Sequence, residues 1–297
     1  TVAGMLLVNN PGTWSAIYPP LEHASWNGWT PTDLIFPFFL FIVGITTHLS
    51  LQARRARGDT DSALVRQIIR RGVIIYLLGF MMAAFPFYQY GTIEGLTNPS
   101  LWEKIVYRAE HVRIMGVLAR IGVVYIIAAL LTLRTTLKQQ IVILSVLLYG
   151  YWFAMTLIPI PGQGIGALFL DDPARTLAAY LDRVILTPNH IWAGSRTFDP
   201  EGPFSTIPAI GTAILGVIAG RWIGQPRPLL ERISGMFAAG CLAMMVGMMW
   251  NWSFPINKSI WTSSYVLFTA GMACTAIATI MWITDHYNIR WWARPFV

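Results

Sequence analysis

One stretch of the sequence begins with a carboxylate and continues without another polar side chain: Asp33-Leu-Ile-Phe-Pro-Phe-Phe-Leu-Phe-Ile-Val-Gly44. The largely apolar pattern extends to residue 51. It is therefore close to the length of about 20 residues that a helix needs to cross the hydrocarbon layer of a membrane. Its backbone must be helical there, because unpaired N–H and C=O groups are too costly in lipid. The stretch predicts a transmembrane helix over residues 33–51.

The composition of the chain indicates that this helix is one of several. Of the 297 residues, 55% are hydrophobic and 12% are charged, and the mean hydropathy is +0.53. Soluble domains carry about 25% charged residues, so this chain lacks the polar surface that water requires. The composition excludes a disordered chain, a collagen-like fibre, a disulfide scaffold and a soluble DNA-binding domain.

Apolar segments of similar length recur along the chain. They predict eight spans, at residues 1–9, 33–51, 72–89, 114–133, 139–158, 206–223, 235–251 and 260–283. Because the chain opens inside an apolar run, we expect the first span to be the end of a helix whose start is absent. We find no internal repeat. The predicted fold is an all-α polytopic membrane helix bundle that forms one domain over residues 1–297.

Basic residues alternate between the two sides of this predicted bundle. Thirteen Lys and Arg residues fall on one side, in segments 52–71, 134–138, 221–232 and the tail, and seven fall on the other. Because Lys and Arg are retained on the cytoplasmic side, we expect residues 52–71 in the cytoplasm and residues 10–32 outside. Topology thus explains the net charge of +7, so we expect membrane lipids as partners and no nucleic acid.

Small residues recur four apart in the last three predicted helices, as in Gly216 and Gly220. This spacing lets helices approach closely, so we expect tight packing within the bundle, with a homodimer face as the alternative. Cys241 and Cys274 lie in apolar runs and are expected to be packing residues. The chain lacks a Walker loop, HExxH, GxSxG and zinc-binding spacing, so no metal is expected. The segment Gly162-Gln-Gly-Ile-Gly166 predicts a turn.

Polar side chains crowd in front of the helix predicted at residues 33–51. The segment Leu21-Glu-His-Ala-Ser-Trp-Asn-Gly-Trp-Thr30 contains His23, and histidine can transfer protons near neutral pH. Asp33 lies about one turn inside the membrane boundary, where an ionised carboxylate needs a partner or a function. Thr30 and Asp33 also fit a helix N-cap, and both interpretations of Asp33 remain open.

A second polar cluster, Phe198-Asp-Pro-Glu-Gly-Pro-Phe-Ser-Thr206, opens the span predicted at 206–223. Acidic residues are favoured at a helix N-terminus by the helix dipole. The functional alternative is that Asp199 and Glu201 bind a polyhydroxyl or amine acceptor at the membrane face, with Trp192 stacking on a sugar ring.

A third feature is the arginine pair in Arg113-Ile-Met-Gly-Val-Leu-Ala-Arg120. The seven-residue spacing predicts that both side chains lie on one face of the helix predicted at 114–133. An arginine inside a span implies a paired or ligand-bound role. For Arg120, a salt bridge with Asp33 and a contact with a phosphorylated ligand are both open.

Several segments together resemble the heparan-α-glucosaminide N-acetyltransferase family, which comprises a lysosomal transmembrane enzyme and bacterial homologues. The matching stretches are Val8-Asn-Asn10, His23-Ala-Ser-Trp-Asn-Gly28 with Thr30 and Asp33, Arg113-Ile-x-Gly-Val-Leu-x-Arg120, Asp199-Pro-Glu-Gly202 and Asn257-Lys-Ser-Ile-Trp-Thr-Ser-Ser-Tyr265. They occur in family order over essentially the whole chain. Members usually have further helices after the one that ends near residue 284, so we expect C-terminal helices to be missing here.

The resemblance implies that an acetyl group moves from cytosolic acetyl-CoA to an amine on the other side of the membrane. It implies that His23 is the active-site histidine, with Asn9 as its nearby asparagine and Asn10 as the alternative. A bacterial inner membrane with His23 on the periplasmic side is the expected location. An amino sugar or glycan is the expected acceptor, and the candidate binding residues are Asn10, Trp26, Asn27, Asp33, Asp199 and Glu201.

Two mechanisms are open for this chemistry. His23 can accept a proton from the amine as a general base, or it can attack the thioester and become a transient acetyl-imidazole. Asn9 or Asn27 can donate a hydrogen bond to the oxyanion. The phosphates of CoA need cations, and the candidates are Arg71, Arg113, Arg120, Arg221 and Lys258.

Two other functions compete with acetyl transfer. A sugar permease is the alternative function, although the sequence has neither duplicated halves nor paired broken helices. A non-catalytic scaffold leaves the clustered charged residues unexplained. Binding of acetyl-CoA distinguishes the acetyltransferase from both.

Overall fold

The computed structural model describes residues 2–93 and 95–296, and these form a helical bundle with two very short strands. Seven helices are long and apolar enough to cross a membrane. They are α2 (Ile35–Ala56, extended at its start by the 3₁₀ turn η3, Pro31–Leu34), α3 (Asp61–Ala84), α5 (Val117–Arg134), α6 (Leu137–Leu157), α8 (Thr206–Ile223), α9 (Leu229–Trp250) and α10 (Ser263–Met281). These seven correspond to the predicted spans after the first, which confirms the predicted polytopic bundle.

Of the predicted first span, Thr1 lies outside the described residues, and the remainder forms α1 (Val2–Asn9). Eight residues of α-helix are about 12 Å long, so α1 alone is too short to cross a membrane.

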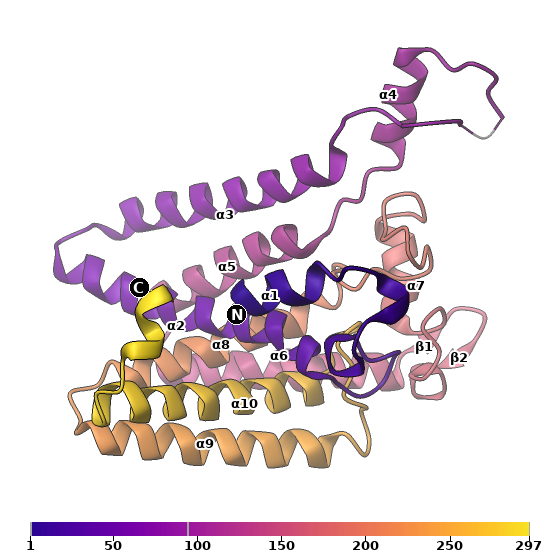
Figure 1. Cartoon of the computed structure of the whole chain (residues 1–297). Coiled ribbons are helices and arrows are strands. Elements are labelled where there is room, and N and C mark those ends of the chain that lie inside the picture. The colour runs from indigo at the N-terminus through magenta and orange to yellow at the C-terminus, as the bar shows by residue number, and fades with distance from the viewer. Residues whose placement is uncertain (1, 94, 297) are drawn as a thin grey trace.

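Helix α8 lies at the centre of the bundle and contacts α2, α5, α6, α9 and α10. Two helices lie at the periphery of the bundle: α9 packs on α10, and α3 packs on α5 (Figure 1). The contact between α2 and α8 is especially close, because a Cβ on Gly216 would lie 2.0 Å from the carbonyl oxygen of Phe41 and one on Gly44 would lie 2.1 Å from that of Ala213. The small residues of α8 therefore serve packing within the bundle, as predicted.

Most short elements gather at the end of the bundle opposite the α2–α3 connection, whereas the turns after α10 lie at the other end (Figure 1). Those opposite the connection include two short helices, α4 (Leu101–Glu110) and α7 (Leu177–Ile185), in segments where the sequence predicted loops. The others are the hairpin β1 (Pro159–Ile160) with β2 (Gly164–Ile165), and the 3₁₀ turns η1 (Trp14–Ala16), η2 (Pro19–Leu21) and η4 (Gly166–Phe169). In the segment Gly162–Gly166, the expected turn is formed at Gly162 and Gln163, and strand β2 and the first residue of η4 follow. After α10 the chain continues through a π-helical turn, η5 (Trp282–His286), to η6 (Trp291–Phe296).

Several predicted boundaries are wrong, and two of them affect arginines that were candidate site residues. Helix α3 begins at Asp61, where the Thr60 hydroxyl accepts the Ala63 N–H, so Arg71 lies on this helix rather than in a loop. Helix α5 begins only at Val117, because Gly116 is extended. Arg113 therefore precedes the helix and does not share a helical face with Arg120.

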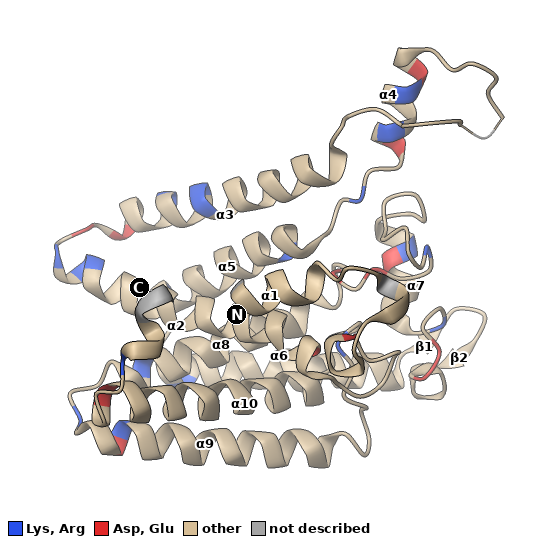
Figure 2. Ribbon diagram, viewed as in Figure 1, with Lys and Arg blue, Asp and Glu red and all other residues tan. Residues whose placement is uncertain are grey.

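Charged residues lie mainly near the two ends of the bundle, and Figure 2 shows long uncharged stretches on α6, α9 and α10. The exposed side chains between the ends are largely apolar, including Leu77, Leu78 and Met82 on α3 and Leu242 and Met245 on α9. Such an apolar outer surface is what lipid contact requires.

Candidate active site

Asp33 joins the start of the α2 segment to the loop that carries His23. One carboxylate oxygen of Asp33 lies 2.7 Å from His23 Nδ1. The other accepts the backbone N–H groups of Ala24 and Thr30, each at 3.0 Å. The side chain of Asp33 is 1% exposed, whereas that of His23 is 52% exposed. Asp33 therefore caps the turn and has His23 as a partner, whereas its predicted contact with the acceptor stays a prediction.

Lys258 completes this cluster from the connection between α9 and α10. Its Nζ lies 3.2 Å from the Asp33 carboxylate, 2.9 Å from His23 Nδ1 and 3.3 Å from His23 Nε2. Burial lowers the pKa of Lys258, and the neighbouring Asp33 partly opposes this effect. Lys258 is one of the cations predicted to bind the phosphates of CoA, but its contacts place it beside His23 instead.

Two residues of the His23 loop tie it to distant parts of the chain. Trp26 Nε1 donates to the Leu170 carbonyl at 2.9 Å. The amide nitrogen of Asn27 donates to Asp171, and its oxygen accepts from Asn257. Because both ends of the Asn27 amide are engaged, its predicted roles in substrate or oxyanion binding are not supported.

His23 lies on the wall between two cavities. The larger, of about 520 Å³, is lined by aromatic side chains that include Trp26, Trp192 and Phe198. The smaller, of about 150 Å³, is lined by Asn9 and other polar residues on one hand and by apolar side chains that include Val8 and Phe36 on the other. Four residues line both cavities: His23, Val117, Glu201 and Lys258. A histidine held by a carboxylate thus faces two adjoining chambers, one of which is large enough for a sugar ring.

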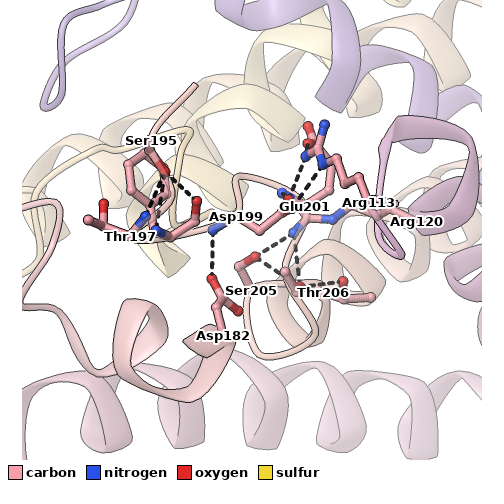
Figure 3. A network of polar contacts seen from close by, with 11 residues as sticks. Arg113, Arg120, Asp182, Ser195, Thr197, Asp199, Glu201, Ser205 and Thr206 are labelled. Carbon is pink, nitrogen blue, oxygen red and sulfur yellow. Dashed lines mark hydrogen bonds and ion pairs between the residues drawn. The ribbon is translucent and has the colours of Figure 1, made fainter. Parts of the chain in front are cut away.

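Glu201 and Asp199 are held by Arg113, which forms two hydrogen bonds to Asp199, at 2.5 and 2.9 Å, and an ion pair with Glu201 (Figure 3). Asp199 is 1% exposed and lines neither cavity. Its predicted contact with the acceptor is therefore not supported. Glu201 lines both cavities, so only Glu201 of this acidic pair remains a candidate for substrate binding.

Arg120 lies behind this segment and is 0% exposed. Its guanidinium donates to the Ser205 hydroxyl and to the Gly202 carbonyl (Figure 3). It also lies 5.1 Å from the ring centre of Trp261. Among the described residues Arg120 forms no salt bridge with Asp33, and its complete burial does not favour the predicted phosphate contact. Its position indicates that Arg120 supports the turn carrying Glu201.

Asp182, on α7, was not predicted from the sequence. One of its carboxylate oxygens accepts the Asp199 N–H at 2.9 Å, as Figure 3 shows. Burial raises its pKa to about 7. An amphipathic helix of nine residues gave no local signal that this carboxylate faces inward.

Comparison with known proteins gives a consistent result over almost the whole chain. Human heparan-alpha-glucosaminide N-acetyltransferase is 30% identical over 98% of this chain, and the mouse protein is 29% identical over 98%. No family model matches the chain. Over almost its whole length, the chain is similar to heparan-α-glucosaminide N-acetyltransferases. It spans about half the length of these two relatives, 48% and 49% respectively.

The remaining predicted residues of this chain are not all gathered at one site. Asn9 lines the smaller cavity with His23, whereas Asn10 lines neither and donates its amide to the Leu6 carbonyl. At the opposite end of the bundle, Arg71 lines a third cavity of about 370 Å³ between α2, α3 and α5. Arg221 does not line it and instead donates to Gln140 and to the Thr135 carbonyl. The five predicted phosphate-binding cations are therefore divided between the two ends.

Proposed function

We propose that this chain transfers the acetyl group of acetyl-CoA to the amine of an amino sugar. The observation that carries this proposal is the His23–Asp33 pair on the wall shared by two cavities. Acyl transfer from a thioester to an amine needs a base and two reactants held against each other. The shared wall offers a base with access to both chambers.

The larger cavity is suited to the acceptor. Trp26 and Trp192 offer flat apolar surfaces for a sugar ring, and Glu201 offers a negative charge for its ammonium group. Asp33 accepts the Nδ1–H of His23 at 2.7 Å, which leaves the lone pair on Nε2. His23 then removes a proton from the amine, which attacks the thioester directly. An acetyl-imidazole intermediate is the competing route.

The smaller cavity is suited to the acetyl end of the donor. Its apolar side chains, which include Met5, Val8 and Phe36, would contact a thin chain, and Asn9 is available to donate to the oxyanion of the tetrahedral intermediate. One face of α2 connects the smaller cavity with the cavity that contains Arg71 at the other end of the bundle. Residues about one turn apart on this face line first the smaller cavity and then the Arg71 cavity. These residues are Ile35 and Phe36, then Phe39, Val43, Thr46, Ser50 and Arg54.

Helix α5 follows the same course, with Val117 in the smaller cavity and Ile121 and Tyr125 in the third. The pantetheine arm would lie between α2 and α5, and the phosphates would lie near Arg54 and Arg71. The excess of basic residues at that end supports a cytoplasmic entrance. His23 would then face the outside, which is the periplasm in a bacterial inner membrane.

The test uses detergent-purified protein. Calorimetry should detect binding of acetyl-CoA without an acceptor, and mixing with glucosamine should release the free thiol of CoA. His23→Ala should lower kcat by about a hundredfold or more and retain acetyl-CoA binding, whereas the exposed His286→Ala should behave as wild type. Absence of acetyl-CoA binding would favour the sugar permease or the scaffold, and full turnover by His23→Ala would remove His23 from the mechanism.

A further inference from the structure

Lys258 places a primary amine where the proposed reaction needs one. Its Nζ lies 2.9 and 3.3 Å from the two ring nitrogens of His23, and its side chain is 22% exposed. Lys258 also lines both cavities beside His23. An acceptor amine attacking a thioester would have to lie close to this position, because it must reach Nε2 of the same imidazole, which Lys258 Nζ approaches to 3.3 Å.

We propose that Lys258 is a self-acetylation site, at which an acetyl thioester bound in the smaller cavity acetylates the Lys258 amine when no acceptor is present. This inference rests on the proposed acetyl transfer and extends it to a residue of the chain itself. Proximity supports it, since an amine held next to a bound thioester reacts as if it were highly concentrated.

The atoms of this step balance without a further reactant. The Lys258 ammonium first loses one proton to solvent, and the neutral Nζ then attacks the thioester carbonyl carbon while His23 Nε2 takes a second proton from it. A C–N bond forms, the C–S bond breaks, and CoA leaves as the thiolate, which takes the proton from His23. Burial, which lowers the pKa of Lys258, makes the neutral amine more accessible.

The product would block the site. An acetylated lysine is a stable neutral amide, so it loses the ion pair with Asp33, now at 3.2 Å, and adds bulk at the wall of the acceptor cavity. Acetylation should therefore inactivate the protein when the donor is abundant and the acceptor is absent. A bound acceptor should protect Lys258 by occupying the same position.

The chain contains its own control, because it has three lysines: Lys104, Lys138 and Lys258. Lys138 is exposed at the start of α6, so non-specific acetylation should favour it over the partly buried Lys258. The experiment incubates the purified full chain with acetyl-CoA alone and follows acetylation of each lysine by peptide mass spectrometry. Acetyl-CoA binding and turnover of glucosamine are measured on the same preparation.

We expect Lys258 to be acetylated about ten times faster than Lys138, or more. Glucosamine should suppress the reaction, and His23→Gln should reduce it to the rate at Lys138. Incubation with acetyl-CoA should inactivate the wild type, whereas Lys258→Arg should keep its own starting activity.

Two results would overturn the inference, and they differ in what else they imply. Equal rates at Lys258 and Lys138 in a preparation that binds acetyl-CoA and acetylates glucosamine would refute self-acetylation and leave the proposed function intact. Absence of both binding and turnover would refute the two together. Rapid acetylation of Lys258 in His23→Gln would show that His23 does not assist the step.

Discussion

Asp33 uses its two carboxylate oxygens for different purposes, one for His23 and the other for the N–H groups of the preceding loop. Asp33→Asn keeps the size of the side chain but removes the negative charge that stabilises the imidazolium ion of His23. We expect kcat for acetyl transfer to fall about a hundredfold or more, with little change in acetyl-CoA affinity by calorimetry. The exposed Asp285→Asn is the control, and an equal loss in both variants would contradict this role.

Asp182 should make stability depend on pH. Its pKa rises from about 3.8 to about 7 on folding because it is buried, so the folded state holds a proton that the unfolded state releases. The stability that this proton contributes is complete below pH 3.8 and is lost as the pH rises through 7. The melting temperature of the wild type should therefore fall relative to Asp182→Asn between pH 4 and 7 and level off above it. Parallel curves would contradict the assignment.

The clustering of His23 and Asp33 before one helix could be predicted because they are ten positions apart, although the sequence did not predict their hydrogen bond. The partners of Arg120 could not be predicted. From the sequence, Asp33 was the available intramembrane carboxylate, but the segment that folds over Arg120 begins more than 80 residues later and contributes Gly202 and Ser205. Such a contact depends on tertiary packing that no local pattern records.

Among the helices, the contact between α2 and α8 depends on the absence of a side chain at Gly216. Gly216→Ala should lower the melting temperature in detergent, because the new Cβ would lie 2.0 Å from the Phe41 carbonyl oxygen. Gly150, on α6, has nothing within 4 Å of the equivalent position. Gly150→Ala should therefore stabilise the protein by up to about 1 kcal/mol through helix propensity. Unfolding of both variants at the same temperature would contradict the close contact.

The positions of the spans could be predicted better than their ends. Hydropathy marks where apolar residues begin, whereas a helix begins where its first N–H groups find acceptors. Thr60 provides such an acceptor for α3, so the helix starts eleven residues before the predicted span. Before α5, the Ile114 N–H instead donates to the His190 carbonyl, and the chain stays irregular through Gly116.

The orientation of the bundle has a direct test. Ser25 and Ser62 are both exposed and lie at opposite ends. In a background with Cys241→Ala and Cys274→Ala, an impermeant thiol reagent added to intact cells should label Ser25→Cys and spare Ser62→Cys. Both should be labelled after lysis. The reverse pattern in intact cells would invert the topology and overturn the proposed transfer across the membrane.

The common face of α2 has a consequence for the cell. In the proposed route, the stretch between the two end cavities is bordered by Ile35, Phe36, Phe39 and Val43, whose side chains offer water no hydrogen bonds. A continuous file of water molecules cannot form along such a lining, so protons and inorganic ions find no conducting path there. An acyl group could therefore be passed through the bilayer while the voltage and proton gradient across it remain intact.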